Sequence, residues 1–247
     1  MKRPVKRILA RFGVRVARTP PHRFDAMADC LEGLAARGFR PALVLDGGAH
    51  RGEWASLALP LFPGARFVLV EPQESCAADL ARLAASRPGI AVVRRALTRP
   101  GVRTVSMDGR AWRAGSTGAR VLDPAESGPG DVAVEAATVD EVAGAEGAGL
   151  APVLLKLDLE GHEEAALEGA GETLARAGAV LVEVQAFAGG GPGAPALRRV
   201  TEALWARGFL LYDVASLAGR PRDGRLRAAD LLFVPAAGPL AADGRWE

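Results

Sequence analysis

The sequence predicts an α/β protein in which helices cover both faces of a mostly parallel sheet. From residue 42 onward, short and nearly continuous apolar runs rich in Val and Leu recur along the chain. Segments of helical character separate most of these runs, and strands buried on both faces are typical of parallel sheets. The chain has 247 residues, of which 49% are hydrophobic, so it can bury one large core or two small ones.

The first segment of the chain is basic. Residues 1–23 contain eight Lys and Arg residues and no acidic residue. Apolar and basic side chains each recur every three or four residues, which predicts a basic amphipathic helix. The two stripes are Val5, Leu9, Phe12 and Val16, and Arg7, Arg11, Arg15 and Arg18. This arm either docks on the rest of the protein or makes peripheral contact with an anionic membrane surface or a partner.

A second helix is predicted over residues 24–37, after a Pro-Pro pair that the first helix cannot include. Its apolar face consists of Met27, Leu31 and Leu34. Gly38 is typical of the residue that ends a helix. We therefore expect a helical arm over residues 1–40 and one domain over residues 41–247.

The domain is predicted to alternate strands with helices. The apolar runs are ALVLD (42–46), RFVLVE (66–71), IAVVRRA (90–96), VLLKLD (153–158), AVLVEV (179–184), FLLYDV (209–214) and DLLFVP (230–235). The predicted helices cover residues 53–59, 74–86, 163–176 and 195–207. Residues 102–140 have short strands and turns without a convincing helix, which predicts an antiparallel excursion at one sheet edge. The Gly/Pro-rich run 188–195 is typical of a flexible loop.

The charge of the chain is unevenly distributed, and this limits its partners. The net charge is +2, but the chain after residue 23 has 23 basic and 29 acidic residues. Enzymes that act on nucleic acids usually present a basic face. Aromatic residues, which stack on single-stranded bases, make up only 5% of the chain. We therefore expect no nucleic-acid substrate.

The cysteines and the apolar runs indicate a cytoplasmic protein. Cys30 and Cys76 are far apart, match no metal-binding spacing and are expected to be reduced. No apolar run approaches the roughly 18 residues that a membrane span needs. The N-terminus lacks the continuous apolar core of a secretory signal.

The stretch VLDGGAHRGEW, residues 44–54, places small residues directly after a carboxylate at the end of a predicted strand. Ligands bind at the carboxyl ends of parallel strands, where small residues let the backbone approach a ligand closely. The glycines do not fit the G-x-G-x-x-G spacing of nicotinamide or flavin sites, whereas Asp46, Gly48 and Gly52 form D-x-G-x-x-x-G. Glu71 ends the next strand, where an acid can accept both hydroxyls of a ribose. Together these features predict a nucleoside-containing cofactor.

Five segments resemble the successive motifs of FkbM-type methyltransferases, which use S-adenosylmethionine. They are VLDGGAHRGEWASLA, FVLVEPQ, RRALT, ATVDEV and LLKLDLEGHEEAALEGAGETL. The resemblance covers about residues 42–186, and its most specific part is the KLDLEGHE block. It implies the class I methyltransferase fold, a Rossmann-like sheet of seven mostly parallel strands with helices on both faces. The last strand, DLLFV, would lie antiparallel between the fifth and the sixth.

The resemblance also implies which residues hold the cofactor. They are Asp46, Gly47, Gly48 and Gly52 around its methionine part, Glu71 at the ribose hydroxyls, Ala96 and Leu97 beside the adenine, and Asp158 beside the sulfonium. Three residues depart from the family pattern, namely His50, Arg51 and Trp54. These departures concern the fit of the substrate more than the use of the cofactor.

Ionisable residues are densest around DLEGHE. Lys156 and Asp158 share one face of the predicted strand, and a turn at Gly161 brings Glu160 and His162 to the same rim. Asp158 is the first candidate for both cofactor positioning and proton acceptance, and a nearby Lys156 would keep it ionised.

Other members of this cluster have alternative roles. His162 has a suitable intrinsic pKa for a base, or it is a helix N-terminal residue that faces solvent. Glu160 is either a base or a turn-forming acid, and Glu163 favours the helix N-terminus by its charge. With one His and no Cys, the cluster is not expected to bind a metal ion.

We therefore expect an S-adenosylmethionine-dependent methyltransferase that acts on a hydroxyl of a sugar, a polyketide or a similar secondary metabolite. One alternative keeps the reaction but moves the acceptor to a nitrogen or a macromolecule. A second alternative is a non-catalytic binding protein that retains the fold. The residues that argue against this second alternative are Asp46, Gly48, Gly52, Glu71 and Asp158.

Overall fold

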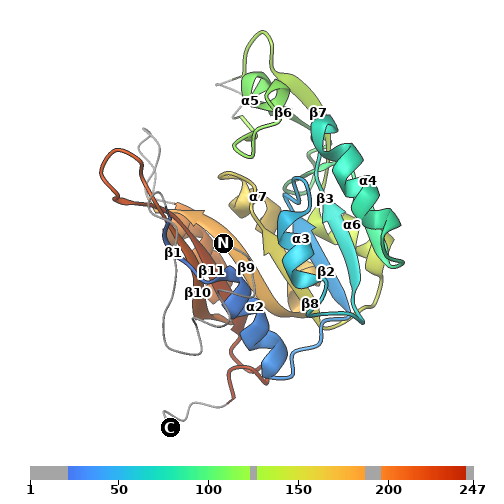
Figure 1. The fold of residues 1–247 in the computed structure, drawn as a ribbon, viewed down its shortest axis with the longest axis vertical. Coiled ribbons are helices and arrows are strands. Elements are labelled where there is room, and N and C mark those ends of the chain that lie inside the picture. The colour runs from blue at the N-terminus through green and yellow to red at the C-terminus, as the bar shows by residue number, and fades with distance from the viewer. Residues whose placement is uncertain (1–21, 123–126, 187–195, 243–247) are drawn as a thin grey trace, which may run out of the picture.

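The computed structural model describes residues 22–122, 127–186 and 196–242. Across these residues the main sheet has eight strands, in the order β1-β10-β11-β9-β8-β2-β3-β4 (Figure 1). Their bounds are β1 (His22–Asp25), β2 (Leu43–Gly47), β3 (Arg66–Val70), β4 (Ile90–Val93), β8 (Val153–Leu157), β9 (Ala177–Gln185), β10 (Phe209–Gly219) and β11 (Leu226–Pro235).

The strand directions confirm the predicted fold class. Strands β9, β8, β2, β3 and β4 pair in parallel, and β11 lies antiparallel between β9 and β10, as expected for DLLFV. The predicted number of seven strands is corrected to eight, because β1 adds an antiparallel edge strand beside β10. Phe24 and Asp25 therefore belong to a strand, and helix α2 (Met27–Ala36) begins three residues later than predicted. Pairing with β10, which is distant in sequence, overrides the local helical pattern at these two residues.

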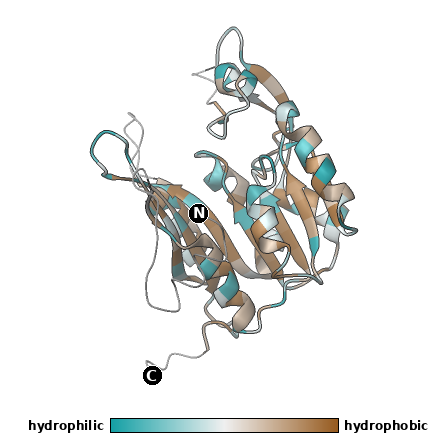
Figure 2. Ribbon diagram, in the orientation of Figure 1, coloured by the Kyte–Doolittle hydropathy of each residue, from teal (hydrophilic) through white to brown (hydrophobic). Residues whose placement is uncertain are grey.

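Helices cover both faces of the main sheet. Side chains alternate along β2, so that Leu43 and Leu45 pack on one face and Val44 on the other. The first face is covered by α6 (Val139–Gly147), α7 (Glu163–Glu168), α8 (Gly171–Ala175) and α9 (Ala196–Trp205). The second is covered by α2, α3 (Glu53–Ala58) and α4 (Ala77–Ala85), which follows a short 3-10 turn at Glu74–Cys76. Hydrophobic residues follow the strands between these layers (Figure 2).

The start of the described chain packs into the same core. Cys30, Leu31 and Leu34 of α2 are buried in the cluster that also contains Leu232 of β11. The basic arm predicted before β1 and the loop predicted over residues 188–195 lie outside the described residues. Cys30 and Cys76 are both free and buried. Within the parts of the chain that the structure describes, no helix has the length and apolar character needed to cross a membrane.

Three strands between Ala96 and Ala137 form a small second sheet rather than an excursion at the edge of the main one. Its order is β5 (Ala96–Leu97), β7 (Val132–Ala137) and β6 (Thr104–Met107), with a parallel β5–β7 pair. The expectation that no helix occurs here is also wrong, because α5 spans Gly109–Arg113. The Asp108 side chain caps α5 by accepting from two backbone N–H groups, but a five-residue helix is too short to show an apolar period.

Two further differences from the prediction concern helices. The predicted helix 163–176 is divided into α7 and α8 at Gly169, where an added Cβ would lie 2.6 Å from the Thr98 carbonyl oxygen. Helix α6 was not predicted, although Thr138 and Glu141 form a capping box at its start.

The loop after β2 crosses the end of β8 at very short range. Gly48 has a φ of +73°, and its N–H donates to the Val70 carbonyl at 3.0 Å. A Cβ at this position would lie 1.9 Å from the Asp158 carbonyl oxygen. Only glycine fits such a crossing, and it brings the ends of β2, β3 and β8 together.

We expect Gly48→Ala to lower the free energy of unfolding by about 2–4 kcal/mol, from the left-handed backbone and the forced displacement of Asp158. Denaturant unfolding measures this change. The matched control is Gly144→Ala inside α6, where a Cβ meets no atom within 4 Å. The control should be stabilised by about 0.5–1 kcal/mol. Equal stability of the two variants would contradict the close contact between Gly48 and Asp158.

Candidate functional site

A pocket opens where β2, β3 and β8 end and the small sheet begins. Seven residues predicted for the site line it, namely Gly48, Glu71, Ala96, Leu97, Asp158, Glu160 and His162. The other four predicted residues, Asp46, Gly47, Gly52 and Lys156, are not part of its lining. The structure thus brings together segments that are distant in sequence, as the carboxyl ends of parallel strands require.

Glu71 is held in place by the backbone. Its Oε2 accepts from the His50 N–H at 2.9 Å and its Oε1 from the Gln73 N–H at 2.9 Å. Burial raises the pKa of Glu71, while these two hydrogen bonds and the charge of Lys156 act in the opposite direction. Each carboxylate oxygen has a second lone pair, so Glu71 can still accept two hydroxyl groups from a ligand.

His50 connects the loop after β2 to the small sheet. Its backbone has a φ of +46°, which is unusual for a residue other than glycine and turns its N–H toward Glu71. Its Nε2 lies 3.3 Å from the Gly115 carbonyl oxygen. His50, one of the three residues that depart from the family pattern, is therefore part of the pocket wall.

Lys156 and Asp46 form a buried ion pair beneath the pocket. Lys156 Nζ lies 3.0 Å from Asp46 Oδ1 and 3.5 Å from Asp158 Oδ2, and it donates to the Gly48 carbonyl at 2.9 Å. Burial alone would lower the pKa of Lys156, but Asp46 and Asp158 raise it above its usual value. Lys156 therefore stays protonated, and its contacts are those of a positioning residue.

The turn after β8 depends on Glu163. Glu160 has a φ of +53° and Gly161 of +102°, so the chain reverses sharply before α7. The Glu163 side chain is 1% exposed, and its Oε1 accepts from the N–H groups of Leu159 at 2.8 Å and Gly161 at 3.1 Å. Burial raises the pKa of Glu163 to about 7. These two hydrogen bonds hold the turn, while the effect of its charge on the helix N-terminus stays a prediction.

His162 faces the small sheet from the N-cap position, directly before α7. Its Nε2 lies 3.0 Å from Thr98 Oγ1. Thr98 follows β5 directly and is 1% exposed. Thr98 could not be assigned a role from the sequence, because a lone threonine after a predicted strand carries no distinctive pattern.

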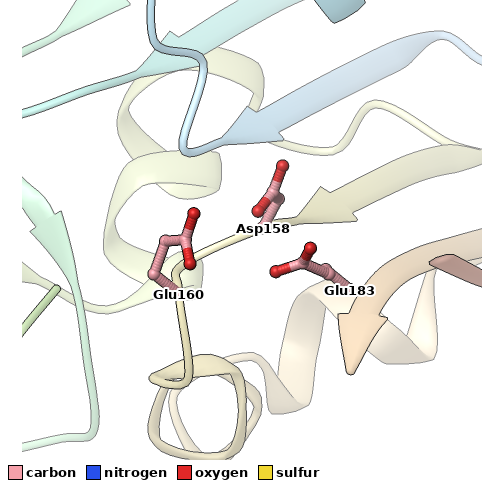
Figure 3. A group of neighbouring side chains, drawn as sticks. All are labelled: Asp158, Glu160 and Glu183. Carbon is pink, nitrogen blue, oxygen red and sulfur yellow. The ribbon is translucent and has the colours of Figure 1, made fainter. Parts of the chain in front are cut away.

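Three carboxylates from two strand ends face one another at the rim of the pocket. Oxygens of Asp158, Glu160 and Glu183 all lie within 4.8 Å of one another (Figure 3). Burial, with the nearby charges of Asp158 and Glu160, raises the pKa of Glu183 to about 9. The pKa of Glu160 is also raised, first by burial and then by Asp158.

Glu183 was missed in the sequence. It is the one acid in the apolar run AVLVEV, and an acid in a buried strand is an informative departure from the pattern. The expectation that this rim binds no metal ion rested on its lack of Cys and its single His. Carboxylate oxygens are the ligands of Mg²⁺ and Ca²⁺ rather than of Zn²⁺, so the absence of a metal ion stays a prediction.

Solved structures similar to this chain include several methyltransferases. Precorrin-6y C5,15-methyltransferase from Geobacter metallireducens GS-15 has a TM-score of 0.45 and 10% identity, covering 89% of this chain and 93% of its own. The 1,6-didemethyltoxoflavin-N1-methyltransferase of Burkholderia thailandensis, solved with S-adenosylhomocysteine, has a TM-score of 0.45 and 16% identity, with 85% and 79% covered. Aeropyrum pernix fibrillarin, with bound S-adenosyl-L-methionine, has a TM-score of 0.46 and 15% identity, with 84% and 73% covered.

A search of curated protein sequences finds no match to the chain. The family model described as the methyltransferase FkbM domain, in contrast, matches residues 46–211. This range is more than half of the chain, begins at Asp46 and includes the loop after β2, Glu71, the turn after β8 and Glu183. The chain therefore belongs to the FkbM methyltransferase family.

Proposed function

We propose that this methyltransferase transfers a methyl group from S-adenosylmethionine to a hydroxyl oxygen of a sugar or a secondary metabolite such as a polyketide. The observation that carries the proposal is the placement of Glu71 and Asp158 on the wall of one pocket. The Glu71 carboxylate is held by two backbone N–H groups and can accept the hydroxyl groups of a ribose. Asp158 lies at the rim of the pocket, and its side chain is 39% exposed.

The residues around the pocket fit S-adenosylmethionine. A Cβ on Gly47, the last residue of β2, would lie 2.7 Å from the Leu97 side chain and 3.2 Å from the Lys156 carbonyl oxygen, so the backbone is closely packed here. Glu71 would hold the ribose hydroxyls, and Ala96 and Leu97 would border the adenine. When bound, the cofactor supplies a methyl carbon activated by a positively charged sulfur. The close packing after β2 and the Glu71 carboxylate support the placement of the cofactor in this pocket.

Asp158 is proposed as the proton acceptor. The Asp158 carboxylate would take the hydroxyl proton as the acceptor oxygen gains the methyl group, and the cofactor would supply that methyl carbon and keep the electrons of its carbon–sulfur bond. Lys156, at 3.5 Å, balances the charge on Asp158 before the proton arrives. His162 and Glu160 line the same pocket and are the next candidates for the base.

The charges at the rim favour a small acceptor over a nucleic acid. Asp158 and Glu160 would repel a phosphate backbone, whereas oxygens of all three carboxyl groups at this rim can accept hydrogen bonds from hydroxyl groups. A nitrogen acceptor remains the alternative within the same reaction. The free, buried cysteines support a cytoplasmic location, and the basic arm is proposed to contact a membrane surface, a partner or the domain itself. Turnover of isotope-labelled cofactor with a panel of hydroxylated glycosides, polyketides and lipids tests the reaction.

Two substitutions should separate cofactor binding from chemistry. Glu71→Ala removes hydrogen bonds worth about 1.5–3 kcal/mol, so calorimetry should show roughly ten- to hundredfold weaker S-adenosylmethionine binding with little change in the saturated rate. Asp158→Asn keeps the shape but cannot take a proton, so turnover should fall by about 10²–10⁴-fold with a smaller change in affinity. Near-native turnover by folded Asp158→Asn would move the base to His162 or Glu160.

Glu183→Gln should change how stability depends on pH. Because the pKa of Glu183 is raised from 4.5 to about 9, folding favours its protonated form. The stabilisation that this shift in pKa gives the folded state is complete below pH 4.5 and is lost as the pH rises through 9. Relative to Glu183→Gln, the unfolding free energy of the unchanged protein should therefore fall between pH 5 and pH 9, measured by denaturant titration.

The matched control is Glu32→Gln on the exposed face of α2, whose stability should run parallel to that of the unchanged protein. Parallel curves for Glu183→Gln as well would contradict a proton held at the rim. Stabilisation of the unchanged protein by Mg²⁺, lost in Glu183→Gln, would show that the three carboxylates hold a cation instead.

A further inference from the structure

Gln73 is a buried polar residue on the wall of the pocket, and the sequence pattern around it predicts no role for its side chain. It follows Glu71 by two residues after β3 and is 4% exposed. Its backbone N–H donates to Glu71, and its side-chain Nε2 donates to the Ser116 carbonyl at 3.1 Å. Gln73 therefore joins the candidate ribose-binding carboxylate to the loop that follows α5.

The contact with Ser116 fixes the orientation of the Gln73 amide. Rotating the amide by half a turn would place Oε1 against the Ser116 carbonyl oxygen, and two acceptors repel each other. Oε1 is therefore the atom that remains available. It is buried and has no hydrogen-bond partner among the described residues. A buried acceptor without a donor is unfavourable, so this position is suited to a ligand that carries an N–H group.

The rest of the wall around Gln73 is apolar. Leu97 of β5, Met107 of β6, Ala119 and Val121 all line the same pocket. A flat aromatic base fits such a wall, because apolar side chains bury its faces while few polar atoms are left to read its edge. Gln73 is thus placed to read the edge of a base whose ribose lies at Glu71.

We propose that Gln73 Oε1 accepts a hydrogen bond from the 6-amino group of the cofactor's adenine and so selects adenine over a purine with a 6-oxo group. The inference rests on the proposed use of S-adenosylmethionine. A 6-oxo purine presents a carbonyl oxygen at the same position. That oxygen faces Oε1 as a second acceptor, which leaves both atoms without a donor.

Calorimetric binding of two ligands tests the proposal. They are S-adenosylhomocysteine and its 6-oxo counterpart, S-inosylhomocysteine. The unchanged protein should bind the adenine compound at least about tenfold more tightly, which corresponds to one hydrogen bond. Gln73→Met keeps the length of the side chain without its acceptor, so the preference should fall below about threefold, mainly through weaker binding of the adenine compound.

The matched control is Gln185→Met in β9, outside the pocket lining, which should keep the full preference. Failure of the folded, unchanged protein to bind S-adenosylhomocysteine would overturn the proposed cofactor. Tight but equal binding of both compounds by the unchanged protein would overturn only the role of Gln73. This outcome is measured without any variant, so it does not depend on whether Gln73→Met folds. A preference that persists in folded Gln73→Met would overturn that role as well.

Discussion

A single buried ammonium group holds the two halves of the site in one arrangement. Lys156 lies between Asp46 and Asp158 and donates to the Gly48 carbonyl, so β2 and β8 meet through charge as well as through strand pairing. Burying an ammonium group is unfavourable by several kcal/mol unless opposite charge and hydrogen bonds surround it. Any slip between the two strands would separate Lys156 from Asp46, so the loop after β2 and the turn after β8 keep a fixed relation.

The carboxylates of this region are alike in chemistry and differ in what surrounds them. Glu71 is held by two backbone N–H groups beside the apolar wall of the pocket. Glu163 instead accepts two hydrogen bonds from the backbone of the turn before α7. Asp158 faces the pocket from beside a protonated lysine, while Glu183 stands among other acids and keeps its proton. The roles of binding, scaffolding and proton transfer that we propose for them therefore follow from their environments rather than from residue type.

The central strands and most of the pocket could be predicted from the sequence, because parallel strands leave continuous apolar runs and bring their carboxyl ends together. Features that depend on contacts between distant segments could not. Phe24 and Asp25 become strand through pairing with β10, and the break at Gly169 depends on Thr98. The role of Gln73 could not be predicted for the same reason, since only the folded chain shows that its side-chain Nε2 donates to the Ser116 carbonyl.

The added edge strand has a consequence for the approach of large molecules. β10 runs in the same direction as β9, and β1 runs against β10, with His22 opposite Ala218 near the end of β10. The chain therefore enters β1 from the rim on which the parallel strands end, which is also the rim of the pocket. Any large molecule bound close to the start of β1 would therefore lie on the side of the sheet where the pocket opens.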